Sequence, residues 1–351
     1  MSWDVALILS VDGLANGAVY LLAGIGLVLI FSVTRVVFVP FGDIAAFAAL
    51  SLAAFETGRL PPTIWLVLTL AAVAVAVEVT ACLRRGEVAQ IPRAVFGWGV
   101  LPALPCALAW ALNGWGAPAA LQVVAAIALV VPLAPLVARL ALQPVADASV
   151  LVLLIVSLAL HFLLAGLGLL FFGPEGFRTA PLAEGALPLG GGFSISAQVL
   201  LMISAALVLS ALSFLVFERT VAGKALRATA VNRVGARLVG IRPQRTALLA
   251  YGFASLLAGL IGVLIAPVTT MYYDSGFIIG LKAFVAAIIG GLVSYPLTAL
   301  GALAVGLVES FASFWSGAMK EAIVFSLLIP VLLLRSVFAA HVEEEPEEIE
   351  A

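Results

Sequence analysis

The chain has 351 residues, of which 64% are hydrophobic and 10% are charged, and its net charge is -2. Soluble domains are about 45–50% apolar and about 25% charged, so this composition excludes a soluble globular protein. A membrane-spanning helix needs about 20 apolar residues, and the chain therefore predicts an all-α, polytopic transmembrane helical bundle with about 9–11 membrane segments.

The first membrane segment is predicted over the apolar run 14–33, and the next stretch is interrupted at Pro40, Gly42 and Asp43. Proline removes a backbone donor, so a helix is expected to end before this point. A half-length apolar helix, 44–55, follows the break. No basic segment and no A-x-A cleavage site opens the chain, so no cleaved signal peptide is expected.

The rest of the chain predicts further membrane segments separated by polar breaks. They lie at 63–83, 96–112, 118–138, 150–172, 196–217, 246–266, 277–293 (a short one), 297–314 and 319–335. The Gly- and Pro-rich stretch 173–195 is expected to be a loop. We assign 1–338 to one transmembrane domain and 339–351 to a disordered acidic tail.

The pattern of a helix, a break and a short helix occurs twice, at 14–55 and at 246–293. In the topology predicted below, the two copies cross the membrane in opposite directions. This predicts an inverted repeat with broken or re-entrant helices, and such breaks mark translocation paths.

The polar segment 218–245 holds seven of the 17 Lys and Arg residues and a single acid, Glu218. Loops rich in Lys and Arg remain in the cytoplasm, so alternation places the C-terminus inside and 173–195 and the N-terminus outside. The segment either only fixes this orientation or also docks a cytoplasmic partner.

Three charged residues, Asp43, Lys282 and Glu309, lie within apolar stretches. Charges at this depth cost a few kcal/mol and face a cavity or a partner, unless they lie near a segment end and reach the interface. For Asp43 we expect a structural role as well, in which its carboxylate caps the short helix 44–55 by accepting backbone N–H bonds.

No nucleotide-binding or catalytic pattern is present in the sequence. It contains no G-x-x-x-x-G-K-[ST] motif, and its two histidines and two cysteines, Cys82 and Cys106, predict neither a metal site nor a disulfide. We therefore expect no enzyme activity, no bound cofactor or metal and no nucleic-acid partner.

Five stretches, in this order, resemble the inner-membrane permease subunit of branched-chain amino-acid ABC importers. They are Asn16–Phe31, Val37–Ile44, Arg139–Pro174, Arg227–Ile241 and Gly280–Ser310. Phe38 and Phe41 stand where that family has Asn and His, and Val231-Asn232 replaces its Glu-Asp pair. Relative to the family, 61–115 resembles an insertion of extra spans.

This resemblance implies a permease subunit that moves branched-chain amino acids or similar small polar solutes across the bacterial inner membrane. Its implied partners are cytoplasmic ABC ATPase subunits that use ATP and Mg²⁺, a sister permease in a heterodimer or homodimer, a periplasmic solute-binding protein and the lipid bilayer. The segment 218–245 then corresponds to the family's cytoplasmic coupling loop.

The resemblance also assigns roles to individual residues. The residues expected to couple to the ATPase are Leu226, Arg227, Ala228, Asn232, Arg233, Ala236, Arg237, Leu238 and Gly240. We expect Ala225–Gly240 to form one short docking helix, with Leu226 and Leu238 as its apolar anchors. The residues expected along the translocation pathway are Phe41, Gly42, Asp43, Lys282 and Glu309.

Two other classes of function remain open at this point. An ion-coupled secondary transporter would use Asp43, Lys282 and Glu309 as coupling charges, and an assembly protein would transport nothing. A secondary transporter needs no large cytoplasmic docking loop, whereas an ABC permease does.

Overall fold

The computed structural model describes residues 3–113, 117–190 and 193–333, and the predicted acidic tail 339–351 lies outside them. The described residues are mostly helical, which confirms the all-α prediction. The bounds of the helices are α1 (Trp3–Thr34), α2 (Phe41–Glu56), α3 (Thr63–Arg85), η1 (Val88–Gln90), α4 (Ile91–Val95), η2 (Phe96–Val100), α5 (Leu101–Asn113), α6 (Ala119–Val130), α7 (Leu133–Val137), η3 (Ala138–Leu142), η4 (Gln143–Val145), α8 (Val150–Phe172), α9 (Ala197–Arg219), α10 (Val221–Val231), α11 (Arg233–Leu238), α12 (Pro243–Ile265), α13 (Ser275–Ile289), α14 (Tyr295–Trp315) and α15 (Lys320–Ser326).

Eight helices within the described ranges are long and apolar enough to cross a membrane. They are Trp3–Thr34, Thr63–Arg85, Val88–Asn113, Ala119–Val145, Val150–Phe172, Ala197–Arg219, Pro243–Ile265 and Tyr295–Trp315. The apolar helices α2 and α13 are shorter, as the sequence predicted for both. The protein is therefore a multi-span helical membrane protein.

The predicted break near Pro40 is present, because α1 ends at Thr34, residues 35–40 are not helical and α2 begins at Phe41. The first helix is longer than expected and begins at Trp3 rather than at residue 14. Its first turns tolerate polar residues: the Ser10 hydroxyl donates back to the carbonyl of Ala6 at 2.7 Å. A polar side chain that hydrogen-bonds to a carbonyl of its own helix in this way does not end the helix.

A second break lies between α12 and α13, at 266–274, so the pattern of a helix, a break and a short helix is present twice. The two short helices meet at their first turns. A Cβ on Gly42 would lie 1.8 Å from the carbonyl oxygen of Gly276, and a Cβ on Gly276 would lie 2.2 Å from that of Gly42. Only glycine allows two backbones to approach this closely.

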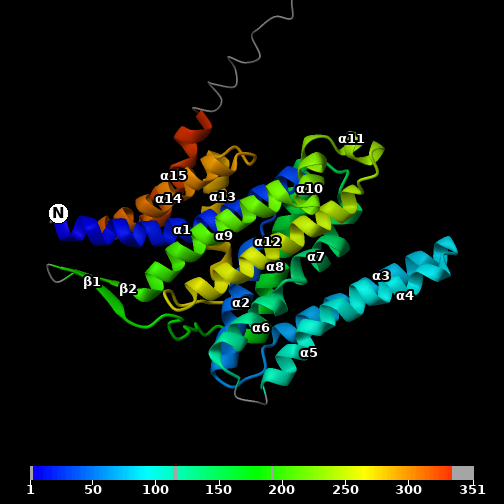
Figure 1. Cartoon of the computed structure of the whole chain (residues 1–351), viewed down its shortest axis with the longest axis horizontal. Helices are drawn as coiled ribbons and strands as arrows, with labels where there is room; N and C mark the ends of the chain where they lie inside the picture. The colour runs from blue at the N-terminus through cyan, green and yellow to red at the C-terminus, as the bar shows by residue number, and fades with distance from the viewer. Residues whose placement is uncertain (1–2, 114–116, 191–192, 334–351) are drawn as a thin grey trace, which may run out of the picture.

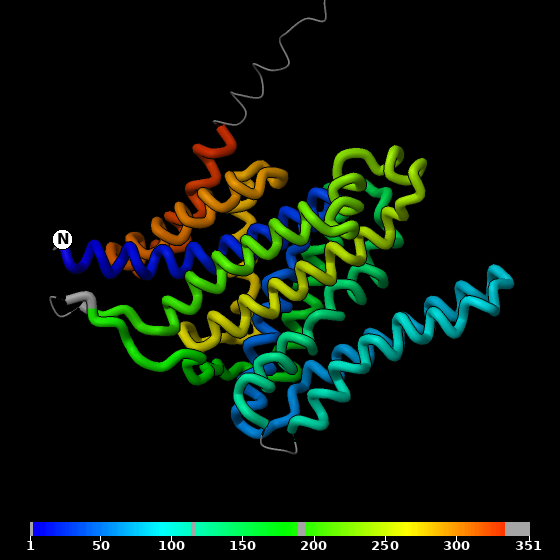
Figure 2. The backbone as a smooth tube through the Cα atoms, viewed as in Figure 1, coloured from blue at the N-terminus to red at the C-terminus, as the bar shows by residue number. Residues whose placement is uncertain are grey.

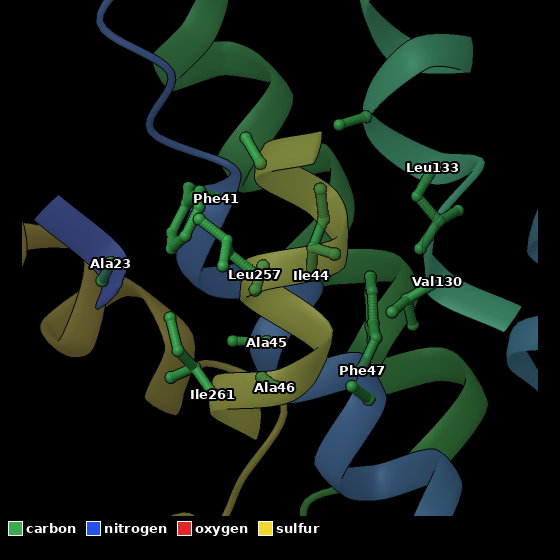
Figure 3. Packing of buried hydrophobic residues seen from close by; sticks show 14 of the residues in the cluster. Ala23, Phe41, Ile44, Ala45, Ala46, Phe47, Val130, Leu133, Leu257 and Ile261 are labelled. Atoms are coloured by element: carbon green, nitrogen blue, oxygen red, sulfur yellow. The ribbon is translucent and has the colours of Figure 1, made fainter. Parts of the chain in front are cut away.

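Helix α2 is the centre of the core and is buried along almost its whole length. Figure 3 shows Phe41, Ile44 and Phe47 of α2 packed among side chains of neighbouring helices, including Leu257 of α12 and Val130 of α6. Because lipid tails are as apolar as these side chains, close van der Waals packing rather than exclusion from water holds such a core together.

The first and the fourteenth helix also pack through glycines. A Cβ on Gly306 would lie 2.3 Å from the backbone nitrogen of Gly17 and 2.4 Å from the carbonyl oxygen of Gly13. Gly13 and Gly17 form the G-x-x-x-G spacing that places two glycines on one helix face. Two helices that are far apart in the sequence, α1 and α14, therefore form one pair, and they lie side by side in Figure 2.

The loops gather at two ends of the bundle. At one end, which we call the arginine end, Arg85, Arg139, Arg233 and Arg237 line one cavity. At the opposite end, which we call the hairpin end, the predicted loop 173–195 contains a β-hairpin of β1 (Ala186–Gly190) and β2 (Phe193–Ser196) that the sequence analysis did not predict.

Contacts at the hairpin end tie distant segments together. The backbone of Phe177 pairs with that of Met271, and the side-chain amide of Gln198 donates to the carbonyl of Leu264 at 2.9 Å. Glu56, at the end of α2, accepts a bond from the backbone of Ala180 at 3.1 Å. Helix α2 therefore runs from the first break to the hairpin end.

The extra spans expected at 61–115 form a helical hairpin of α3 and the run Val88–Asn113. This hairpin diverges from the bundle in Figures 1 and 2, where it is drawn in cyan. Its ion pair with the bundle joins Glu78 of α3 to Arg139 of η3. The expected extra spans therefore form an element that diverges from the rest of the bundle.

Candidate functional site

The first break is held by two side chains of α8, placed one helical turn apart. The backbone nitrogen of Val39 donates to the Ser157 hydroxyl at 2.9 Å. The Nδ1 atom of His161 lies 2.9 and 2.8 Å from the two carboxylate oxygens of Asp43. All three side chains involved are buried. Backbone polar groups in a membrane must find partners within the protein, and Ser157 supplies one where the helix is absent.

The expectation that Asp43 caps the short helix is wrong. The N-cap position of α2 is Pro40, and no side chain caps it. Asp43 is the third residue of α2, and its carboxylate bonds His161 of α8 instead. The signal for this pairing was the single histidine in the apolar run 150–172, since a buried carboxylate needs a donor at membrane depth.

His161 also stacks on Phe277 of α13, with ring centroids 4.5 Å apart. The Asp43–His161 pair therefore lies where both breaks and both short helices meet. An apolar cavity of about 170 Å³ beside this point is lined by Phe38, Val39 and Phe277 among others, and its lining does not include Phe41, Gly42 or Asp43.

The two other intramembrane charges contact each other. The Lys282 ammonium lies 2.5 Å from one oxygen of Glu309 and 3.1 Å from Glu321 of α15. The Tyr20 hydroxyl donates to the other oxygen of Glu309 at 2.5 Å. Lys282 and Glu309 are 3% and 7% exposed, so both face the protein rather than lipid, as the cost of a bare charge in lipid predicts.

The segment 218–245 contains two short helices, α10 and α11, rather than one helix over Ala225–Gly240. Asn232 separates them: its side chain accepts a bond from the backbone of Gly235 at 2.9 Å and caps the second helix. Asn is among the best N-cap residues, and this signal was available in the sequence. Gly240 lies just after α11 and has a φ of 85°, a conformation that glycine adopts without strain.

The residues expected to couple to an ATPase divide into two groups. Leu226 and Ala236 are buried within this chain, at 5% and 3% exposure, so Leu226 is no anchor for a partner. Arg233 donates two bonds to the carbonyl of Val33, at 2.7 and 3.2 Å, and Arg227 pairs with Glu218 at 2.5 Å. Burial and the nearby positive charge of Arg35 lower the pKa of the Arg233 guanidinium.

The exposed part of this segment is strongly apolar. We call it the apolar ridge, and its residues with their exposed fractions are Val231 (87%), Val234 (67%), Leu238 (84%) and Val239 (75%). Leu238 keeps the position expected of an anchor, and Val239 was expected as a smaller residue of the same surface, whereas Val231 and Val234 were not expected to take part. The ridge lies between basic side chains such as Arg237, which the sequence predicted at this surface.

The bundle and its candidate spans define the chain as a multi-span helical membrane protein with two helix breaks. The family model described as branched-chain amino acid transport system / permease component matches residues 94–334, which is more than half of the chain. The chain belongs to this family. The matched range excludes the two stretches within 16–44 that resemble the family, and it includes part of the insertion predicted at 61–115.

Curated relatives agree with this assignment. The chain is 31% identical over 204 residues to the high-affinity branched-chain amino acid transport system permease protein LivH of Escherichia coli (strain K12) and of Salmonella typhimurium. That alignment covers 56% of this chain and 66% of LivH, slightly less than two thirds of the relative. BraD of Pseudomonas aeruginosa, a permease protein of the same description, is 34% identical over 140 residues, which cover 39% of this chain and 45% of BraD. No solved structure matches the chain.

Proposed function

We propose that this chain is the membrane-spanning subunit of an ABC importer for branched-chain amino acids or similar small polar solutes. The observation that carries the proposal is the apolar ridge on α10 and α11. Four large apolar side chains stand exposed on a polar segment between two membrane helices. A cluster of exposed apolar residues rimmed by charges is typical of a surface that binds another protein.

The partner that this surface fits is a cytoplasmic ATPase, because the chain carries no phosphate-binding loop of its own. The ridge would transmit the movements that accompany hydrolysis of ATP with Mg²⁺ in that subunit to the membrane helices. The names of LivH and BraD, which are permease proteins of branched-chain amino acid transport systems, support branched-chain amino acids as the solute. The proposal further includes a sister permease as the second half and a binding protein that delivers the solute from outside.

The rival function, an ion-coupled transporter, finds less support. Asp43, Lys282 and Glu309 are each bonded to another side chain of this chain, and a structural role accounts for all three. The buried network around Lys282 then stabilises the packing of α13, α14 and α15.

The coupling proposal is tested by placing charge on the ridge. We expect Val234→Asp combined with Leu238→Asp to abolish solute-stimulated ATP hydrolysis and transport in proteoliposomes, because the apolar anchors of an interface carry most of its binding energy. The fold should persist, since both side chains are exposed in the isolated chain. Ala236 is unsuitable for this test, because it is buried.

The matched control is Val88→Asp, which also adds a charge to an exposed valine, at the first residue of the run Val88–Asn113 and away from the ridge. This variant should transport at the rate of the wild type. Normal coupling in the ridge variant, with the ATPase bound, would show that the docking surface lies elsewhere.

The orientation is a separate prediction. In a chain whose two buried cysteines are replaced, Leu187→Cys on the hairpin should react with a membrane-impermeant thiol reagent added outside intact cells, and Leu238→Cys should not. In cells that express the chain without its ATPase, both positions are exposed, at 57% and 84%, so a difference reports sidedness rather than burial. The physical basis is the retention of Lys- and Arg-rich loops in the cytoplasm. The opposite labelling pattern would invert the topology.

A further inference from the structure

A cavity lies where the diverging hairpin of α3 to α5 faces the bundle. Figures 1 and 2 show the hairpin separating from α7 toward the arginine end. A cavity of about 440 Å³ lies at this end, and its walls come from α1, α3, η3, α11 and α12. Helices α1, α3 and α12 lie far apart in the sequence, so only the tertiary fold forms this cavity.

The cavity carries an excess of positive charge. Four arginines line it, Arg85, Arg139, Arg233 and Arg237, against two acids, Glu78 and Asp147. Arg139 pairs with Glu78, and Arg233 bonds the carbonyl of Val33. In the part of the chain that the structure describes, neither Arg85 nor Arg237 has an ion-pair partner. Two guanidinium groups are therefore available to an anion.

A second, apolar cavity of about 600 Å³ lies further along the helices. It is lined by α5, α6 and α12, with Leu104, Ile127 and Leu256 as examples. On α12 the lining passes from Leu248 and Tyr251 in the charged cavity to Leu256 and Leu260 in the apolar one. Along α12, a cationic cavity at the arginine end is thus followed by an apolar cavity at membrane depth, and we call these two cavities together the groove.

This pattern matches one kind of ligand. We propose that the groove binds a glycerophospholipid with an anionic headgroup, whose phosphate contacts Arg85 and Arg237 and whose acyl chains lie along α5, α6 and α12. Guanidinium groups bind phosphate oxygens through paired hydrogen bonds, and acyl chains fill an apolar groove that no soluble anion could use. The lipid would fix the detached hairpin to the bundle, independently of the transported solute.

The test measures lipid bound to the full purified chain. Detergent-solubilised protein is exchanged into vesicles of phosphatidylcholine with or without phosphatidylglycerol, and retained lipid is measured by native mass spectrometry. Arg85→Gln combined with Arg237→Gln should weaken phosphatidylglycerol retention about thirtyfold, from the contribution of two basic residues to binding an anionic lipid. Ala128→Trp, which fills the apolar cavity, should reduce retention with all arginines intact.

The matched control is Arg93→Gln combined with Arg219→Gln, which removes two exposed arginines that do not line the cavity. Retention in this control should equal that of the wild type. Equal losses in both double variants, or full displacement of the lipid by inorganic phosphate, would overturn the proposal. If the double variant of Arg85 and Arg237 aggregates, Arg85→Gln alone is measured instead, and its phosphatidylglycerol retention should be about fivefold weaker.

Discussion

Replacement of Lys282 by methionine should destabilise the protein more than any other single change in its charged network. Methionine keeps the length of the side chain, so the change removes the ammonium and leaves Glu309 and Glu321 without it. Breaking a buried ion pair by removing one partner costs about 3–5 kcal/mol, because the other charge remains buried. A fall in the thermal unfolding midpoint of the purified protein measures this loss.

Two further variants separate the loss of the buried ion pair from the general effect of replacing a lysine by methionine. Lys320→Met removes a lysine that lies 3.8 Å from Glu321 and is 37% exposed at its side chain, so its unfolding midpoint should stay near that of the wild type. Adding Glu309→Gln to Lys282→Met should recover part of the stability, because the uncompensated carboxylate is removed. An unchanged midpoint in Lys282→Met would mean that the network does not hold α13 to α14.

Substitution of Gly42 by alanine should be comparably damaging, although it adds a single methyl group. The new Cβ would lie 1.8 Å from the carbonyl oxygen of Gly276, a backbone atom that cannot turn aside. Overpacking of this kind costs about 1–3 kcal/mol and more where backbones must separate. We expect a lowered unfolding midpoint and a smaller fraction of monodisperse protein in gel filtration.

Gly276→Ala should cause a similar loss, since the two glycines contact each other reciprocally. The control is Gly166→Ala on α8, where a Cβ would have no atom within 4 Å. Alanine favours helix over glycine by about 1 kcal/mol, so this variant should be as stable as the wild type or more stable. Tolerance of alanine at both Gly42 and Gly276 would refute the close contact between the two breaks.

The sequence predicted the features that depend on local chemistry. Pro40 marked the first break, although Gly42 and Asp43, which were expected to interrupt the helix, lie in the first turn of α2. The charge of 218–245 marked the segment that carries the apolar ridge. The burial of Lys282 and Glu309 followed from the cost of a charge in lipid. In each case a residue type restricts its own surroundings, so no knowledge of distant contacts was needed.

Contacts between distant segments were beyond this reasoning. Asp43 meets His161 across 118 positions of sequence, and only the packing of α2 against α8 brings the two together. The burial of Leu226 depends on how α10 folds back onto the bundle, which a pattern of apolar residues does not decide. The division of the coupling segment at Asn232 is different, because the N-cap preference of asparagine was a readable local signal.

The pairing of α1 with α14 sets an order on biosynthesis. The Ser310 hydroxyl donates to the carbonyl of Leu9, which was made 301 residues earlier. At about 5–20 residues per second, a ribosome needs roughly 15–60 s to cover that distance. For this time the Gly13 and Gly17 face of the first helix has no final partner in the bilayer. Premature termination before residue 295 would therefore leave this glycine face of α1 without the helix that covers it, although α9, α12 and α13 would still be present to contact α1.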